Sequence, residues 1–139
     1  MSTTLIIIAG IIVLFVLYSI FNYRRLKNAP EVENSPSIKV LSDKNFVHQI
    51  KNGVTLVDFW ASWCMPCKMM TPVINEVAES VNGKASVGKL DVEKYQSIAA
   101  KYNIRNIPTM VLFRNGKEVS RFVGAKNKDF LVKQIINAN

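Results

Sequence analysis

An unbroken apolar run near the amino end is the longest hydrophobic pattern in the chain. Fifteen of the 17 residues from 5 to 21 are apolar, and they show neither the alternation of a strand nor the stripe of an amphipathic helix. A run of this length can cross a bilayer, helped by the polar and aromatic residues that flank it. The pattern predicts that residues 1–23 form one transmembrane anchor, which contacts the lipid bilayer through residues 5–21.

The residues around this run bear on its processing and its orientation. A cleaved signal peptide would need a positively charged start and a small-residue cleavage site, and neither is present. Arg24, Arg25 and Lys27 follow the run, whereas no basic side chain precedes it. By the positive-inside rule, this predicts a retained single-pass anchor in the cell membrane, with the rest of the chain on the cytoplasmic side. Residues 24–37, which include two prolines, are expected to form a linker.

Beyond the linker, the hydrophobic period changes repeatedly between that of a strand and that of a helix. The expected strands are residues 38–41, 54–60, 85–92, 109–113 and 118–123, and the expected helices are residues 42–52, 64–81, 95–102 and 127–136. Ser42 is expected to cap the first of these helices, and Asn115-Gly116 to form a hairpin turn. The order βαβαβαββα predicts an α/β domain over residues 38–139, built on a mixed sheet.

Charge and composition narrow the classes of function. The chain has 139 residues, enough for one soluble domain, and a net charge of +8. Within the domain the basic residues are scattered singly rather than grouped into a stripe, which argues against nucleic acid as a partner. Two cysteines and one histidine exclude a disulfide-rich scaffold and most metal sites made of several histidines.

The two cysteines, Cys64 and Cys67, stand where a strand is expected to end and a helix to begin. The free N–H groups and positive dipole of a helix N-terminus favour the thiolate, so Cys64 is predicted to be an exposed nucleophile. Cys67 lies one helical turn further on and can attack a mixed disulfide formed by Cys64. The pair is therefore predicted to cycle between dithiol and disulfide.

Other uses of a Cys-x-x-Cys pair fit this sequence less well. A zinc site would lack ligands, because His48 is the only other good nitrogen or sulfur donor. Covalent haem attachment would need a histidine in place of Lys68. A purely structural disulfide would close a loop of only four residues and remove only about 2 kcal/mol of loop entropy.

Several spaced motifs of the domain occur together and in a fixed order. They are Val-Asp-Phe-Trp-Ala-Ser-Trp-Cys-Met-Pro-Cys-Lys at 57–68, Pro72, Lys-Leu-Asp-Val at 89–92, Ile-Pro-Thr at 107–109, Phe-Arg-Asn-Gly-Lys at 113–117 and Val-Gly-Ala at 123–125. This set resembles the thioredoxin family over about residues 38–139. The resemblance implies a thioredoxin fold, in which helices cover both faces of a mixed central sheet, preceded here by one transmembrane helix.

The resemblance also implies roles for individual residues. Cys64 and Cys67 would form the redox-active disulfide. Asp58 would be the buried carboxylate that handles the proton of Cys67, with Lys89 as its charged neighbour and Trp60 packed beneath the site. The substrate-binding surface would consist of Trp63, Met65, Pro66, Ile107, Pro108 and Gly124, with a cis peptide bond before the proline.

The implied function is a protein-disulfide reductase of thioredoxin type that is tethered to a membrane. It would use no metal and no bound organic cofactor. Its partners would be disulfide-containing proteins and a thioredoxin reductase or membrane electron donor. Met65 replaces a glycine of the family pattern and adds apolar bulk beside Cys64, and Asn106 replaces another glycine.

Two alternatives stay open at the level of sequence. One is a domain on the envelope side that reduces apocytochrome or other exported proteins. The other is a binding or scaffold subunit, in which the thioredoxin fold is used and redox activity is incidental.

Overall fold

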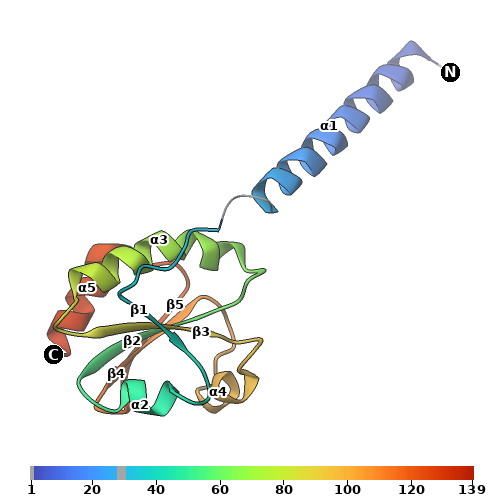
Figure 1. The fold of residues 1–139 in the computed structure, drawn as a ribbon. Helices are drawn as coiled ribbons and strands as arrows, with labels where there is room; N and C mark the ends of the chain where they lie inside the picture. Colours follow the sequence, from blue (N-terminus) through green and yellow to red (C-terminus); the bar gives the residue numbers. More distant parts are fainter. Residues whose placement is uncertain (1, 28–30) are drawn as a thin grey trace. The chain divides into compact units, whose positions relative to one another are not determined.

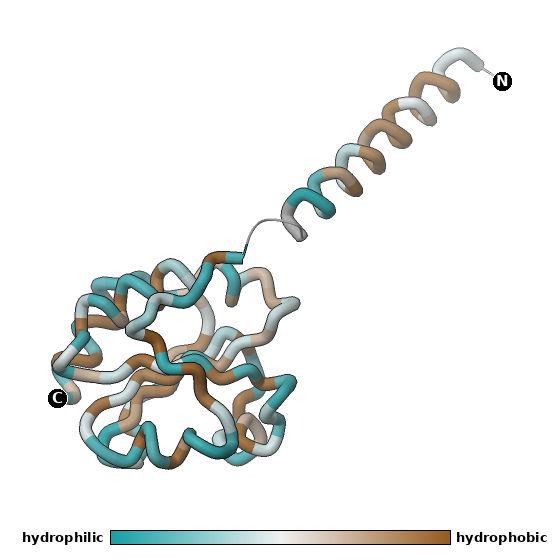
Figure 2. Tube along the Cα trace, in the orientation of Figure 1, coloured by the Kyte–Doolittle hydropathy of each residue, from teal (hydrophilic) through white to brown (hydrophobic). Residues whose placement is uncertain are grey.

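A long helix occupies the start of the chain. The structure is a computed structural model that describes residues 2–27 and 31–139, and the chain divides into two compact units, residues 1–31 and 32–139. α1 (Thr3–Lys27) includes the whole predicted apolar run (Figure 1). Figure 2 colours most of α1 as hydrophobic, with hydrophilic residues at its C-terminal end. By length and composition, α1 suits either a membrane span or a signal sequence.

Five strands form one mixed sheet, as predicted. They are β1 (Ile38–Leu41), β2 (Val54–Trp60), β3 (Ser86–Asp91), β4 (Thr109–Arg114) and β5 (Lys117–Val123), in the spatial order β1-β3-β2-β4-β5. β1, β3 and β2 run parallel, whereas β4 and β5 pair antiparallel. β2 is therefore central, and its residues from Val54 to Phe59 are all buried, which explains its near-continuous apolar sequence.

Four helices cover the two faces of this sheet. They are α2 (Phe46–Ile50), α3 (Met65–Ser80), α4 (Gln96–Lys101) and α5 (Lys128–Asn137). Figure 1 shows α3 and α5 on one face and α2 and α4 on the other. Successive strand residues point to opposite faces, so Leu56 joins the core beneath α3 and α5, whereas Val57 and Phe59 pack with Phe46. The predicted α/β architecture is confirmed.

The start of α2 differs from the prediction. Ser42 does not cap the helix, because residues 43–45 form a turn and Asn45 takes the N-cap position. The N–H of Ser42 donates instead to Oδ1 of Asn45 at 2.8 Å, and its carbonyl accepts from Phe46 N–H at 2.9 Å. An Asn side chain readily closes such a turn on the backbone. The bounds of the helices and strands that follow agree with the predictions within one residue.

The hairpin between β4 and β5 positions part of the later site. Asn115 and Gly116 have φ values of 50° and 82°, as a tight hairpin turn of the predicted Asn-Gly type requires. The turn, together with a one-residue register shift between Leu112 and Phe113, sets the pairing in which Thr109 faces Val123. One residue beyond this pair, the N–H of Gly124 donates to the carbonyl of Pro108 at 2.9 Å. The hairpin thus holds Gly124 against Pro108.

Gly88 in β3 marks a close approach between neighbouring strands. A Cβ atom added there would lie 2.7 Å from Cδ1 and 2.9 Å from Cγ of Leu41, which is itself almost fully buried. We expect Gly88→Ala to lower the free energy of unfolding by about 1–3 kcal/mol, as overpacking of a core does. Urea unfolding measures the loss, and repeating it in a Leu41→Ala background is the control. An equal loss in both backgrounds would mean that the contact with Leu41 is not the cause.

Candidate functional site

The two cysteines lie at the carboxyl end of β2, as predicted, and are joined in a disulfide with their Cα atoms 5.2 Å apart. Cys64 is the N-cap of α3, and the N–H of Cys67 points at its sulfur from 3.3 Å. The same N–H and the helix dipole favour a thiolate at Cys64 once the disulfide is reduced. In this oxidised state Cys64 is only 4% exposed and Cys67 1%, so the nucleophile is less exposed than expected.

A ring of apolar groups surrounds the disulfide. Ala61 and both cysteines form a small buried cluster, against which Trp60, Val92 and Ile107 pack. The peptide bond between Ile107 and Pro108 is cis, as expected. Since Gly124 is hydrogen-bonded to Pro108, the loop before β4 and the end of β5 meet next to this cluster. Of the residues predicted to bind substrate, the structure therefore brings Ile107, Pro108 and Gly124 together.

The remaining residues predicted to bind substrate lie on the exposed rim. Trp63 is 64% exposed, and its indole N–H donates to a carboxylate oxygen of Glu93 at 2.7 Å. Met65 and Pro66, in the first turn of α3, are also exposed. Met69 on the same helix is 72% exposed, because the buried face of α3 runs through its neighbours Met70 and Thr71 instead. It follows Met65 by four residues, so both methionines lie on one side of the helix.

Asp58 and Lys89 form a buried polar pair next to the cysteine-bearing helix. They are directly opposite one another in the β2–β3 register, and both are buried. Asp58 shares its side of β2 with Leu56, which is the side that α3 covers. Lys89 donates to the hydroxyl of Thr71 on α3 at 3.1 Å, and its ammonium lies 4.5 Å from the ring centroid of Trp60.

The environment of Asp58 strongly disfavours its charged form. The carboxyl group is fully buried, and neither oxygen accepts a hydrogen bond from the part of the chain that the structure describes. Burial raises the pKa of Asp58 from 3.8 to about 7, although the positive charge of Lys89 opposes the shift. A carboxyl group with this pKa can exchange a proton near neutral pH.

Sequence reasoning missed two residues that complete the site. The hydroxyl of Thr71 accepts a hydrogen bond from the ammonium of Lys89. The only sign of this role in the sequence is that Thr71 follows Cys67 by four residues on the same helix. Glu93 holds the indole of Trp63 from 30 residues away, and no pattern in the sequence points to it. Both contacts depend on the folded sheet.

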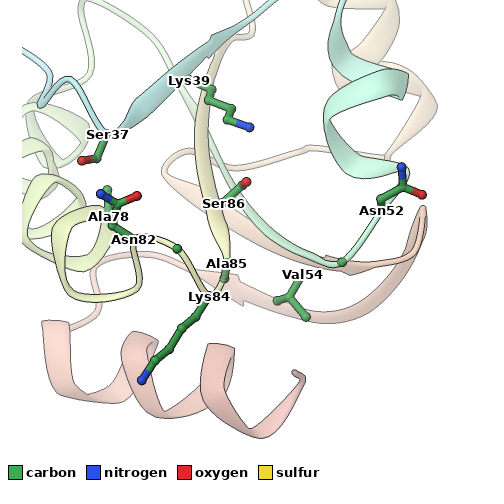
Figure 3. Close-up of a pocket in the computed structure, with 11 residues that line it drawn as sticks. Ser37, Lys39, Asn52, Val54, Ala78, Asn82, Lys84, Ala85 and Ser86 are labelled. Atoms are coloured by element: carbon green, nitrogen blue, oxygen red, sulfur yellow. The ribbon is translucent and has the colours of Figure 1, made fainter.

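A separate polar depression of about 310 Å³ lies at the opposite end of the parallel strands, where Val54 starts β2 and Ser86 starts β3. Figure 3 shows that the ammonium groups of Lys39 and Lys84 in its wall point in different directions. The two lysines therefore do not form an anion site. Among residues 2–27 and 31–139, no three His, Cys, Asp or Glu side chains are placed to hold a metal ion.

The order in which the reduced cysteines react with an alkylating agent should reveal their roles. We expect iodoacetamide to label Cys64 first, because Cys64 is at the N-cap and is the more exposed of the two. Mass spectrometry of peptides after a short pulse measures the order, with the urea-unfolded protein as the control in which both thiols react alike. Faster alkylation of Cys67 in the folded protein would reverse the roles.

Comparison with known proteins agrees with this geometry. A family model described as thioredoxin matches residues 37–137. Thioredoxin of Staphylococcus saprophyticus is 46% identical over 99 residues, which cover 71% of this chain and 95% of that protein. Thioredoxin of Staphylococcus haemolyticus is 45% identical over 97 residues, which cover 70% of this chain and 93% of that protein. A solved structure of a mutant thioredoxin from Halobacterium salinarum superposes with a TM-score of 0.68 at 34% identity, covering 77% of this chain and 96% of that one. The fold, the Cys-x-x-Cys disulfide and the similarity to these proteins together show that the chain belongs to the thioredoxin family of protein-disulfide oxidoreductases.

Proposed function

We propose that this protein is a membrane-tethered thioredoxin that reduces disulfide bonds in protein substrates. In this proposal residues 1–23 form the anchor, residues 38–139 form the thioredoxin domain, and residues 24–37 connect them. The observation that carries the tether is α1, an apolar helix of 25 residues without an acidic or basic side chain before Arg24. Residues 28–30 of the linker lie outside the described residues.

The proposed reaction consists of two thiol-disulfide exchanges. The Cys64 thiolate attacks one sulfur of the substrate disulfide, the S–S bond breaks, and the other substrate sulfur leaves and takes up a proton. Cys67, as a thiolate, then attacks the Cys64 sulfur of the mixed disulfide and releases the second substrate thiol. Two electrons pass to the substrate, and the protein is left with the Cys64–Cys67 disulfide. A thioredoxin reductase or a membrane electron donor must then reduce it.

We assign the proton of Cys67 to Asp58. The pKa of about 7 makes its carboxylate a usable base near neutral pH, and Lys89 supports the charged form that accepts the proton. The exposed Trp63 and Met65, together with Ile107, Pro108 and Gly124, are proposed to receive the extended substrate segment. This apolar surface suits a protein substrate better than a small thiol compound.

Insulin reduction by the full-length chain in detergent micelles tests the redox function. With dithiothreitol as the electron source, the wild type is expected to precipitate the insulin B chain, and Cys64→Ser is expected to give only the background rate. In cells, a Cys64→Ser variant that replaces the wild type fully would favour the scaffold alternative.

A single-cysteine reporter tests the membrane and its side. We propose that the domain is cytoplasmic, because Arg24 and Arg25 follow the apolar run and no basic side chain precedes it. The exposed residue 31 is a suitable position, in the variant Glu31→Cys without Cys64 and Cys67. A membrane-impermeant maleimide is expected to label it only after lysis. Labelling of intact cells would place the domain on the envelope side, and recovery of the chain from the soluble fraction would exclude the anchor.

A further inference from the structure

The last residues of the linker are fastened to the helix that carries the cysteines. The side chain of Asn75 on α3 makes two hydrogen bonds to this segment: Oδ1 accepts from Ser35 N–H at 2.9 Å, and Nδ2 donates to the carbonyl of Glu33 at 2.8 Å. We call residues 33–37 the strap. Its Ser35 is only 9% exposed, and the carbonyl of Ser35 accepts from the N–H of Ile38, the first residue of β1.

Asn34 of the strap lines a small cavity that also reaches Lys89 of the buried polar pair. The cavity has a volume of about 100 Å³, enough for several water molecules. Its lining residues are Asn34 of the strap, Val40 and Leu41 of β1, Trp60 of β2, Lys89 and Asp91 of β3, and Lys94 and Tyr95. Lys89, opposite Asp58 in the sheet register, thus connects the cavity to the carboxyl group that is proposed to handle the proton of Cys67.

We propose that Asn75 is a positioning residue, which holds the strap across this cavity and thereby limits how much water reaches Lys89 and the neighbouring Asp58. For its effect on turnover, the proposal rests on the proposed function, in which Asp58 accepts the proton of Cys67. Water next to a buried carboxyl group stabilises its charged form, so the strap keeps the carboxyl a stronger base than it would otherwise be. The segment that leads to α1 is in this way part of the redox site.

The charged groups around the cavity do not offer a simpler way than hydration to change the pKa of Asp58. Lys89 is the charged group that acts on its pKa, and burial is the larger cause of the shift. Asp91 has a side chain that is only 12% exposed, but it lies 4.0 Å from the exposed Lys94 ammonium and accepts hydrogen bonds from the N–H groups of residues 93 and 94. Tyr95 is the remaining titratable group of the lining. From α3, the titratable group in the neighbouring cluster is Cys67, which is bound in the disulfide. In the oxidised protein, hydration is therefore the variable that the strap can change.

Titration of Asp58 in the oxidised full-length protein in detergent micelles tests the proposal, with the carboxyl carbon observed by NMR. Asn75→Ala removes both hydrogen bonds from the strap, and Asn34→Gly removes a wall residue with those bonds left in place. In both variants the midpoint of the Asp58 titration is expected to fall by about one pH unit, which is a tenfold loss of the proton affinity of this carboxyl group. The acid limb of the pH profile for insulin reduction is expected to move by the same amount.

Ser80→Ala is the matched control, because it removes one exposed hydroxyl bond, to the carbonyl of Glu76, on the same helix. It is expected to keep the wild-type midpoint. Hydrogen exchange of the Ser35 amide is expected to accelerate in Asn75→Ala and to stay slow in Ser80→Ala. An unchanged midpoint in either cavity variant, or an unchanged Ser35 exchange rate in Asn75→Ala, would overturn the proposal. Because the titration needs no turnover, an inactive wild type would overturn the proposed function alone.

Discussion

Replacing Cys67 with serine is expected to convert the protein into a covalent trap for its substrates. Cys64 could still attack a substrate disulfide, because its N-cap position and the N–H of residue 67 are retained. The resulting mixed disulfide would persist, because the second thiol that resolves it is missing. Turnover in insulin reduction is expected to fall by about 10³-fold or more, as when one member of a catalytic unit is removed. Cys64→Ser should be equally inactive but should trap nothing.

The trap is measured by non-reducing gel electrophoresis of whole-cell extracts from cells that express Cys67→Ser. Higher-mass species that disappear on reduction and include the protein are expected, and their other members identify the substrates. The exposed Ser62→Ala serves as the control next to the site and should behave as the wild type. If Cys64→Ser formed the mixed disulfides and Cys67→Ser did not, Cys67 would be the attacking residue.

Asp58→Asn is expected to stabilise the protein above neutral pH. The pKa of Asp58 is about 7 in the folded state, against 3.8 as the ordinary value, so the folded state holds a proton that the unfolded chain has released between these two values. The wild type must therefore lose stability as the pH rises from about 4 to about 7, with a limiting loss of about 4 kcal/mol at 1.4 kcal/mol per pH unit. A neutral amide avoids this loss.

Urea unfolding of the oxidised proteins between pH 4 and pH 8 measures the effect without titration of the cysteines. The wild type and Asp58→Asn are expected to converge at the acid end and to separate as the pH rises. The exposed Asp43→Asn is the control and should follow the wild-type curve. Insulin reduction by Asp58→Asn near pH 7 should be slower by about tenfold or more, since its base is missing. Parallel stability curves for the wild type and Asp58→Asn would show that Asp58 is charged throughout.

The sequence predicts best those helices, strands and turns that are specified by residues close together in the chain. The apolar β-branched run of β2, the Asn115-Gly116 turn and the amphipathic period of α5 each specify their own structure. The spaced motifs then locate the disulfide and the buried pair of Asp58 and Lys89. The roles of Asp58 and Lys89 follow from the resemblance to the thioredoxin family, whereas the two cysteines also stand out by their place at the end of a predicted strand.

The contacts that sequence analysis misses join segments that are far apart in the chain. Trp63 meets Glu93 across 30 residues, Lys89 meets Thr71 across 18, and Asn75 meets Glu33 across 42. Each partner is a common polar residue whose role appears only when the sheet brings two elements together. The same cause explains why the sequence predicts only a linker over residues 24–37, although the strap residues are hydrogen-bonded to α3.

The two edges of the sheet bear on how copies of the domain behave toward one another. β1 has only four residues and includes Lys39, and β5 carries the exposed Lys117, Glu118 and Arg121. An open edge strand can pair with the edge of another copy, and short length and charge oppose such pairing. In the proposed membrane-tethered form, copies of the domain share the plane of one bilayer, where they meet repeatedly. The charged edges would let a crowded population remain monomeric and resist aggregation while its cysteines stay available to partners.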